Sequence, residues 1–581
     1  MTSKTPQFDA LLQPILNALV PHMRTCKNAD KSPYCENGFA VEADDIDFYK
    51  MLRVPPPTFC PTCRHQRRLA FSNYSNIYKR KCDVSGHTET MISAVAPVMP
   101  WVTYDYDTYY SDAWDPREYG CDVDSNESFF EQFLNLEMRV PQPGVRRGAD
   151  SPNSDYSFYG KHMKDCYYVF GGRRNEDIMY GSSIYDSLHV VDAYYIRYID
   201  VGYEHVGTHQ CSKCFFSYFS SNCIECEFIF DCRNCQNCFG CTNLRNKNYC
   251  WFNEQLTKEE YQRRRAEVDL GSQKVKQEFQ KKFWDFVRSQ PVRATRQLQS
   301  EDVSGTDIRS SKNCHHVSQV ESSENIKHCH FAIAGMVNSM DMGFGGKAEN
   351  IYDCQNTGTS SMNVRFSFAV KEAIDSDYLL SCSNCINCFG CIGLKNASYM
   401  IFNKQYSEEE YWTKLDEVKS AMLARGEYGE FFPMHFSCYA YNSSLAQFLF
   451  PLSKEDAAKW GVYFQDETDV DMSALTSIHS SELPDNIQDF TADMCKLAIV
   501  GESSGKPFRV TERELEFYKR YNIALPLDTP YERIARRFTI LNNFRLVPDH
   551  CVSCGVAIES GFPSTDGWRP YCETCYQKEI L

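Results

Sequence analysis

The feature that most constrains this chain is the spacing of its cysteines. Small or apolar residues recur every 12 positions between Cys166 and Cys250, and a second column of cysteines lies three residues earlier. The first column is Cys166, Ile178, Val190, Gly202, Cys214, Cys226, Cys238 and Cys250, and the second is Cys211, Cys223 and Cys235. The intervening segments are rich in Tyr, Phe, Ile and Val, with Asn and Asp beside the register positions. Short β-type segments at a fixed short period predict a β-solenoid, in which stacking of the coils creates the core.

Two internal duplications organise the whole chain. At an offset of 150 residues, the run 235–241 matches 385–391, and the match continues into a predicted helix start at Thr257 and Ser407. Upstream, the halves correspond at a slightly shorter offset. At an offset of 469 residues the two ends match each other, for example Arg67-Arg68 with Arg536-Arg537. We therefore expect the order end module, central half, central half, end module.

These repeats divide a chain of 581 residues, which is too long for one ordinary core. The expected fold class is mainly β with α: a duplicated, cysteine-rich, β-solenoid-like centre with coils of about 12 residues, flanked by treble-clef or zinc-ribbon end modules. The predicted segments are an N-terminal zinc module (1–120), a helical linker (121–153), a first solenoid half with a C-terminal helix (154–300), a second such half (301–430), a linker region (431–500) and a C-terminal zinc-ribbon module (501–581).

The C-terminal module carries the strongest metal signal. Cys551-x2-Cys554 is followed after 17 residues by Cys572-x2-Cys575. Each CxxC pair forms a turn that directs two thiolates at one ion, and two such turns complete a tetrahedral site. We therefore predict that these four cysteines bind zinc.

The N-terminal module has one clear CxxC pair, Cys60 and Cys63, with Cys35 upstream. Ser32 stands where a partner of Cys35 is expected. Cys26 is the first candidate for the fourth ligand, with Cys82 or His65 as alternatives. At the matched positions the C-terminal copy has Ser504, Thr529 and Glu532 in place of Cys35, Cys60 and Cys63, and the N-terminal copy has Ser85, Thr103 and Tyr106 in place of Cys554, Cys572 and Cys575. A duplicated two-zinc module, each copy keeping a different site, explains this pattern, and we expect one to two zinc ions per chain.

The central cysteines have two interpretations. The favoured one is a ladder of packed thiols, because small buried residues recur at one corner of every coil. The alternative is metal, as zinc or, less readily, an iron–sulfur cluster. The candidate ligands would be Cys211, Cys214, Cys223, Cys226, Cys232, Cys235, Cys238, Cys241, Cys382, Cys385, Cys388 and Cys391.

Basic residues with interleaved aromatics follow the N-terminal CxxC pair. They are Arg64, Arg67, Arg68, Lys79, Arg80 and Lys81. Such residues beside a zinc site suit phosphate contact and base stacking, so they are nucleic-acid candidates. The alternative is a solvated, charge-balanced face. A second basic stretch, 262–298, belongs to a predicted helix that continues to about Gln290, and a solvated helix face is the favoured interpretation there.

Net charge and hydropathy limit which compartments and which kinds of partner are expected. With 61 Lys and Arg against 77 Asp and Glu, the formal net charge is −16, which excludes a whole surface that binds polyanions. No apolar run is long enough for a membrane span, and the N-terminus lacks the pattern of a signal peptide. We therefore expect a cytoplasmic protein whose cysteines are thiols or metal ligands.

Several of these motifs also resemble a family. The runs PPPTFCPTCR (55–64), YKRKC (78–82), NCFGC (237–241) and GEFFP (429–433) resemble the uncharacterised long, cysteine-rich zinc-ribbon proteins of candidate-phylum (Parcubacteria-like) bacteria. The resemblance covers nearly the whole chain and implies the architecture and intracellular zinc, with no catalytic residue. The chain departs from the family pattern at Ser32, Ser85, Thr529 and Glu532, where the family has cysteines.

The expected function is a non-enzymatic zinc-binding scaffold. Its rigid repeat centre would space two zinc modules that engage a macromolecular partner, either a protein or RNA and its ribonucleoproteins. A self-assembling structural protein, such as a shell or surface-layer component, is the first alternative, because a solenoid has open ends that can stack. An enzyme with a site in a solenoid groove is the second.

Overall fold

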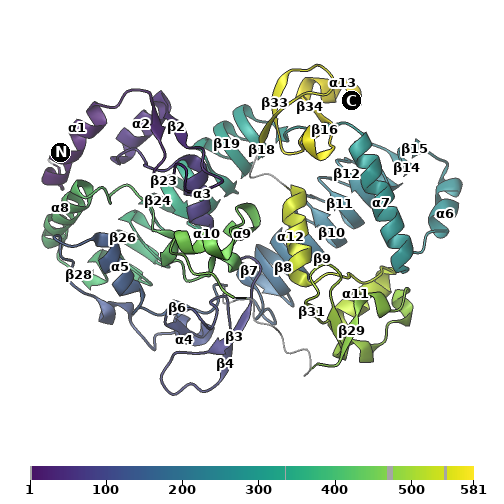
Figure 1. The fold of residues 1–581 in the computed structure, drawn as a ribbon, viewed down its shortest axis with the longest axis horizontal. Coiled ribbons are helices and arrows are strands. Elements are labelled where there is room, and N and C mark those ends of the chain that lie inside the picture. Colours follow the sequence, from purple (N-terminus) through teal and green to yellow (C-terminus); the bar gives the residue numbers. More distant parts are fainter. Residues whose placement is uncertain (1–2, 149, 334, 467–474, 542–545, 581) are drawn as a thin grey trace. The chain divides into compact units, whose positions relative to one another are not determined.

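A computed structural model describes residues 3–148, 150–333, 335–466, 475–541 and 546–580 of the chain. They form two compact units, each built from two separate stretches of sequence. Unit 1 comprises Met1–Val145 and Arg296–Gln465, and unit 2 comprises Arg146–Thr295 and Asp466–Leu581. In Figure 1, purple N-terminal elements accordingly accompany green ones in unit 1, and blue elements accompany yellow C-terminal ones in unit 2. Each end module thus belongs with the central half that is more distant in the expected order of segments.

Unit 1 is a mixed α/β unit. Its helices are α1 (Pro6–Asn17), α2 (Ala43–Leu52), α3 (Pro61–Leu69), α4 (Tyr106–Tyr110), α5 (Phe129–Glu137), α8 (Glu408–Ala424), α9 (Ala446–Leu449) and α10 (Lys454–Lys459). Its short strands are β1 (His22–Thr25), β2 (Gly38–Val41), β3 (Tyr78–Lys81), β4 (Thr90–Ser93), β5 (Thr103–Tyr104) and β6 (Gln142–Pro143). Its large sheet contains β17 (Gln297–Leu298), β18 (Glu301–Arg309), β19 (Lys312–Glu321), β20 (Glu324–Lys327), β21 (His330–Ala332), β22 (Met336–Gly345), β23 (Ala348–Gln355), β24 (Ser361–Arg365), β25 (Ile374–Asp377), β26 (Ser383–Phe389), β27 (Lys395–Ile401) and β28 (Lys404–Gln405).

Unit 2 has the same two components. Its large sheet contains β7 (Phe158–Lys164), β8 (Tyr167–Tyr185), β9 (Leu188–Arg197), β10 (Asp200–Val206), β11 (Ser212–Tyr218), β12 (Glu227–Phe230), β13 (Gln236–Phe239), β14 (Asn248–Trp251) and β15 (Glu254–Gln255). Its helices are α6 (Lys258–Ala266), α7 (Gln273–Ser289), α11 (Glu512–Tyr521), α12 (Pro530–Leu541) and α13 (Glu573–Ile580). Its short strands are β16 (Val292–Arg293), β29 (Ser477–His479), β30 (Ala498–Val500), β31 (Pro507–Phe508), β32 (Val547–His550), β33 (Ala557–Ser560) and β34 (Pro570–Tyr571).

The 12-residue period of the cysteines is the pairing register of the sheet in unit 2. Neighbouring strands from β7 to β14 run parallel, and each residue pairs with the residue 12 positions later, as Val190 pairs with Gly202 and Gly202 with Cys214. The closing pair, β14 and β15, is antiparallel. The sheet is therefore extended by one short strand for every 12 residues of sequence.

The backbone conformation repeats on a shorter period of three residues. From Tyr159 to Phe252 every third residue has a positive φ. Gly171, Gly207 and Gly240 occupy three of these positions. Most residues that follow these corners are buried, and the apolar ones pack together as one core, whereas Lys247, after the corner at Asn246, is exposed. Those core residues are Met163, Cys166, Val169, Ile178, Ile184, Val190, Ala193, Ile196, Ile199, Cys211, Cys214, Cys223, Cys226, Ile229, Cys232, Cys235, Cys238, Cys241 and Cys250. Since Asn and Asp tolerate the left-handed region better than other non-glycine residues, their abundance beside the cysteines has a conformational cause.

The sheet of unit 1 follows the same plan with two single-residue additions. Glu324 pairs with Val337 and Ala348 pairs with Ser361, each 13 positions apart, whereas most other parallel pairs are 12 apart. These additions explain why the two halves match at a shorter offset upstream than downstream. In the same sheet, β19 pairs with β20 and β21, and β22 pairs with the same two strands, so these four parallel strands form a closed ring.

The helices predicted at the end of each half are present. Thr257 caps α6, and Ser407 caps α8 with a capping box to Glu410. The first helix does not run unbroken to about Gln290 as predicted. It ends at Ala266, and a second helix, α7, begins after the cap residue Ser272, because the intervening Gly271 and Asp269 form a turn that interrupts it.

Candidate metal centres

The first candidate centre lies in unit 1 and consists of Cys26, Cys35, Cys60 and Cys63. Their four sulfur atoms all lie within 4.8 Å of one another, and the Sγ atoms of Cys35 and Cys60 are 4.0 Å apart. Cys26 follows β1, and Cys60 caps the N-terminus of α3, whose first turn contains Cys63. The fourth sulfur of this group is that of Cys26, the first candidate from the sequence, and its role as a ligand stays a prediction. Of the two alternatives, His65 packs against the ring of His330 and Cys82 lies in a different cluster.

Backbone donors surround the sulfurs of this first centre. The amides of Asn28 and Cys60 donate to Cys26 Sγ at 3.4 and 3.2 Å, and the amide of Asn37 donates to Cys35 Sγ at 3.3 Å. Such bonds favour the thiolate form that a metal requires. The hydrogen bond from Cys63 lowers the pKa of Cys60 to about 6, in spite of burial, which raises it. The arrangement can therefore supply thiolates to a tetrahedral ion.

The second candidate centre lies in unit 2 and consists of Cys551, Cys554, Cys572 and Cys575. These sulfurs also lie within 4.8 Å of one another, with the Sγ atoms of Cys554 and Cys572 3.9 Å apart. Gly555, directly after the first pair, has φ +74°, which is the left-handed turn expected there. Burial would raise the pKa of Cys551, but backbone N–H groups, foremost that of Cys572, lower it to about 6.

The two centres differ in their exposure to solvent. In the first, Cys26, Cys60 and Cys63 are buried, whereas in the second only Cys551 is buried and Cys554 is exposed. We therefore expect an ion in the second centre to exchange more readily with a chelator.

Each unit also contains the degenerate equivalent of the other unit's centre. In unit 2 the amide and hydroxyl of Thr529 both bond to the Glu532 carboxylate, at 2.8 and 2.7 Å, so a helix cap replaces the two metal ligands. Cys495 stands 469 residues after Cys26 and was missed by the sequence analysis, although the same repeat could have revealed it.

An arginine cluster on α3 fastens the first centre to the sheet of unit 1. Arg64 lies 2.8 Å from Asp341, and Arg67 lies 2.7 Å from Asp353. Arg68, with no exposed surface, contacts both carboxylates at 3.3 and 2.7 Å. The two aspartates occupy left-handed corners on β22 and β23. Burial alone would lower the pKa of Arg64, but the Asp341 carboxylate raises it, so the cluster stays charged.

The equivalent cluster on α12 repeats this arrangement in unit 2. Arg537 contacts Asp192 at 2.7 Å and Glu204 at 3.6 Å. Arg533 lies 3.5 Å from Asp192, and Arg536 lies 3.1 Å from Glu204. The two acidic residues lie 12 positions apart at left-handed corners, as Asp341 and Asp353 do in unit 1. In each unit, therefore, arginines from one copy of the end module pair with acidic residues from one copy of the central half.

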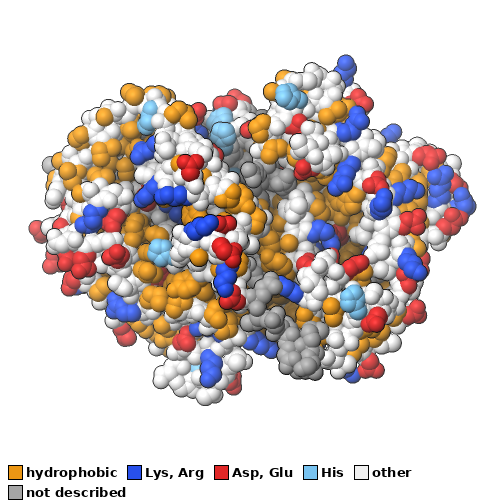
Figure 2. Space-filling view, in the orientation of Figure 1, with side chains coloured by type: hydrophobic (Ala, Val, Ile, Leu, Met, Phe, Trp, Pro, Cys, Tyr) orange, Lys and Arg blue, Asp and Glu red, His pale blue; other side chains and the backbone are white. Residues whose placement is uncertain are grey.

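Burial and ion pairing correct the nucleic-acid prediction for four of the six basic residues: Arg64, Arg67, Arg68 and Arg80. The first three are buried and paired with carboxylates, and Arg80 is buried with a 2.9 Å contact to Asp83, so none offers a free charge to a phosphate. Lys79 and Lys81 on β3 are exposed, and contact between these two lysines and nucleic acid stays an untested prediction. On the face shown in Figure 2, Lys and Arg side chains are interspersed with Asp and Glu. The basic residues Arg263, Arg264 and Arg265 likewise pair with glutamates, as a solvated helix face would.

The central cysteines form a ladder of buried thiols. Cys214 Sγ, for example, lies 3.5 Å from the carbonyl of Ser212 on the same strand and 3.4 Å from that of Cys223, nine residues later. Across the described residues, the groups of three or more close ligand atoms include none of the twelve central candidates, from Cys211 to Cys391. Burial raises the pKa of two further ladder thiols, Cys166 and Cys314, to about 11, whereas hydrogen bonds with Cys382 and Cys388 lower the pKa of Cys385 to about 4. The packed ladder, not metal, is the interpretation that the geometry favours.

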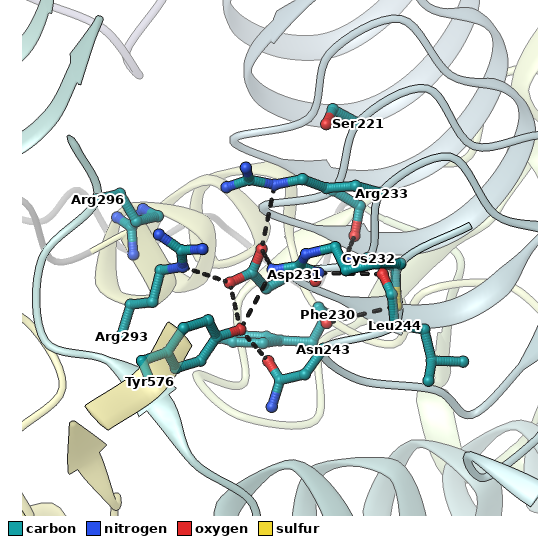
Figure 3. A network of polar contacts seen from close by, with 12 residues as sticks. Ser221, Phe230, Asp231, Cys232, Arg233, Asn243, Leu244, Arg293, Arg296 and Tyr576 are labelled. Atoms are coloured by element: carbon teal, nitrogen blue, oxygen red, sulfur yellow. Dashed lines mark hydrogen bonds and ion pairs between the residues drawn. The ribbon is translucent and has the colours of Figure 1, made fainter. Parts of the chain in front are cut away.

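A polar network connects the second centre to two residues of unit 2 with left-handed backbone, Asp231 and Asn243 (Figure 3). Tyr576, beside Cys575 on α13, places its hydroxyl 2.8 Å from Asp231 and 2.7 Å from Asn243. Arg245 and Arg293 contact the same Asp231 at 3.0 and 3.4 Å, and Figure 3 shows the contact from Arg293. The helix that contains Cys575 and directly follows Cys572 is thereby fixed to the sheet.

No protein-family model matches the chain, and a search of curated protein sequences found no significant match. In the described part of the chain, every helix is too short or too polar to cross a bilayer. Function is therefore argued from the geometry of the two centres.

Proposed function

We propose that the chain is a non-enzymatic zinc scaffold made of two metal-organised units. The observation that carries this proposal is the convergence of two groups of four cysteine sulfurs, each within 4.8 Å, in modules that are fixed to a repeat sheet by buried charges. Four thiolates leave zinc no open position, which is the hallmark of a structural site. The resemblance to cysteine-rich zinc-ribbon proteins agrees with this role.

The repeat centre would be the rigid part of the scaffold. The 12-residue parallel register, the corner at every third residue and the inward column of thiols together support two β-solenoid halves. The zinc modules would then present surfaces to a macromolecular partner. Lys79 and Lys81 are the remaining candidates for contact with RNA or a ribonucleoprotein.

The first test is elemental mass spectrometry of the purified full chain. We expect two tightly held zinc ions per chain, one of which is lost in Cys63→Ser and the other in Cys572→Ser. Absence of metal, or iron in place of zinc, would overturn the proposal. Binding to single-stranded RNA that falls with added salt and with Lys79→Glu would support an RNA partner, and binding insensitive to both would argue against one.

A second candidate function is self-association. Met362, Ile374 and Ile386 pair side by side on neighbouring strands of unit 1, and Met362 and Ile386 are about 40% exposed. Such an apolar row suits contact with a second copy. Sedimentation velocity over a range of concentrations should show larger species that Ile386→Lys removes, whereas a concentration-independent monomer would exclude this function.

A further inference from the structure

A third group of metal-ligating side chains lies in the N-terminal module, outside both four-cysteine groups. It consists of Cys82, His87 and Asp105, whose sulfur, imidazole and carboxylate ligand atoms lie within 4.8 Å of one another. Cys82 is buried, whereas the His87 side chain is 45% exposed. The group therefore combines an anchored thiol with access to solvent.

The duplication shows where this group comes from. Cys82 stands 469 residues before Cys551, so it is the surviving first ligand of the centre that unit 2 retains. Gly86 has φ +86° and its counterpart Gly555 has φ +74°, so the turn after the first ligand has the same hand in both copies. Ser85, Thr103 and Tyr106 replace the other three cysteines.

New donors stand directly beside the lost ones. His87 follows Ser85 by two residues, and Asp105 directly precedes Tyr106. The two donors thus come from the same two turns that supply ligands in the unit 2 centre.

Hydrogen bonds already hold the three groups in place. Cys82 Sγ lies 3.1 Å from Asp105 Oδ2, and the Asp105 amide donates to the sulfur at 3.2 Å. The same Oδ2 lies 3.3 Å from His87 Nδ1. The amide and hydroxyl of Thr108 donate to the carboxylate at 2.9 and 2.7 Å, because Asp105 caps α4. The thiol and the imidazole thus converge on one fixed oxygen.

We propose that Cys82, His87 and Asp105 bind a third zinc ion, with the fourth coordination position left to water. One sulfur, one nitrogen and one oxygen donor suit zinc, and three protein ligands with an open position distinguish a reactive site from a structural one. On binding, the Cys82 thiol releases its proton to solvent, and the thiolate and the Asp105 carboxylate balance the two positive charges of the ion. The exposed edge of His87 leaves the fourth position accessible to water.

The test follows transfer of zinc from the zinc-loaded full chain to the colorimetric chelator 4-(2-pyridylazo)resorcinol. We expect three zinc ions per chain and a fast phase that accounts for one of them, because a three-ligand site with an open position exchanges more readily. His87→Ala and Cys82→Ser should each abolish this fast phase and leave two slower ions. Cys572→Ser should instead remove a slower ion and keep the fast one, which makes it the matched control.

Two results would overturn the third site: a zinc-loaded chain with only two ions, or a fast phase unchanged in His87→Ala. Since His87 is half exposed, that variant should fold as the parent does, and circular dichroism checks this. Failure of the scaffold proposal would be distinguishable, because it would show as loss of the slower ions while the fast phase remained.

Discussion

The two units share one docking contact and differ in which metal centre they keep. In both, three arginines of one helix pair with two acidic corners of the adjoining sheet. In unit 1 the four-cysteine centre includes Cys60 and Cys63, which lie at the start of that same helix. In unit 2 the corresponding positions form a simple helix cap, and the four cysteines lie in a separate ribbon. The arginine–carboxylate contact is therefore the feature that both units share, whereas the four-cysteine group lies at a different place in each end module.

Loss of metal should therefore affect the two units differently, and this is the largest effect we expect. Cys63→Ser should release the metal from the start of α3 and destabilise unit 1 by on the order of 5 kcal/mol, since structural zinc supplies folding free energy. Cys572→Ser should loosen the terminal ribbon and leave α12 protected. Hydrogen exchange with mass spectrometry resolves both helices, and equal loss of protection at α3 and α12 in Cys572→Ser would contradict the comparison.

The arginine contact should matter equally in both units. Arg68→Met leaves Asp341 and Asp353 without their shared cation, and Arg537→Met does the same to Asp192 and Glu204. Each should cost about 3–5 kcal/mol, because the two arginines that remain in each cluster no longer balance the three or more carboxylates that they contact, which leaves negative charge in excess. Urea unfolding followed by hydrogen exchange measures the loss in each unit.

The matched control for these variants is Arg263→Met. Arg263 pairs with Glu260 and Glu267 on an exposed helix face, so its removal should leave the urea midpoint almost unchanged. A similar small effect for Arg68→Met would show that the buried contact does not define unit 1.

The thiol ladders should behave as packing and not as metal ligands. Cys238→Ala in unit 2 and Cys388→Ala in unit 1 occupy matched, fully buried positions, and each should cost about 1–2 kcal/mol through the cavity left behind. Zinc content per chain should stay unchanged in both. Loss of one metal ion from either variant would restore the metal interpretation of the central cysteines.

Two buried lysines, one in each unit, should give both units a pH dependence of the same sign. Burial lowers the pKa of Lys276 in unit 2 and of Lys419 in unit 1 to about 7. Because the unfolded chain binds the proton more tightly, stability should rise with pH above about 7 by up to ~1.4 kcal/mol per pH unit for each lysine, and level off near pH 10.5. Below pH 7 the protonated lysine imposes its full cost.

Lys276→Met should remove this slope in unit 2 alone, and Lys419→Met in unit 1 alone. Lys276 donates to the carbonyls of Ala524 and Leu525 at 2.8 and 2.7 Å, whereas Lys419 lies 3.6 Å from Asp377. A slope in unit 2 that survives Lys276→Met would show that the proton is lost elsewhere.

The sequence by itself determined the local pattern. The 12-residue register and the three CxxC pairs of the two four-cysteine groups can be read from neighbours along the chain, because repeat length and turn geometry are local properties. The fourth ligand Cys26 could also be ranked first from spacing. The change in offset between the two halves, which comes from single-residue additions near Val337 and Ser361, was also visible in the sequence.

Only the tertiary structure decided which pieces belong together. A sequence shows that Arg64, Arg67 and Arg68 are basic, but it cannot show that Asp341 and Asp353, nearly 300 residues away, take up their charge. The same holds for Asp105, whose carboxylate becomes a candidate ligand only because α4 begins beside Cys82. Ion pairs and metal sites depend on distance in space, and the pairing of each end module with one central half sets those distances.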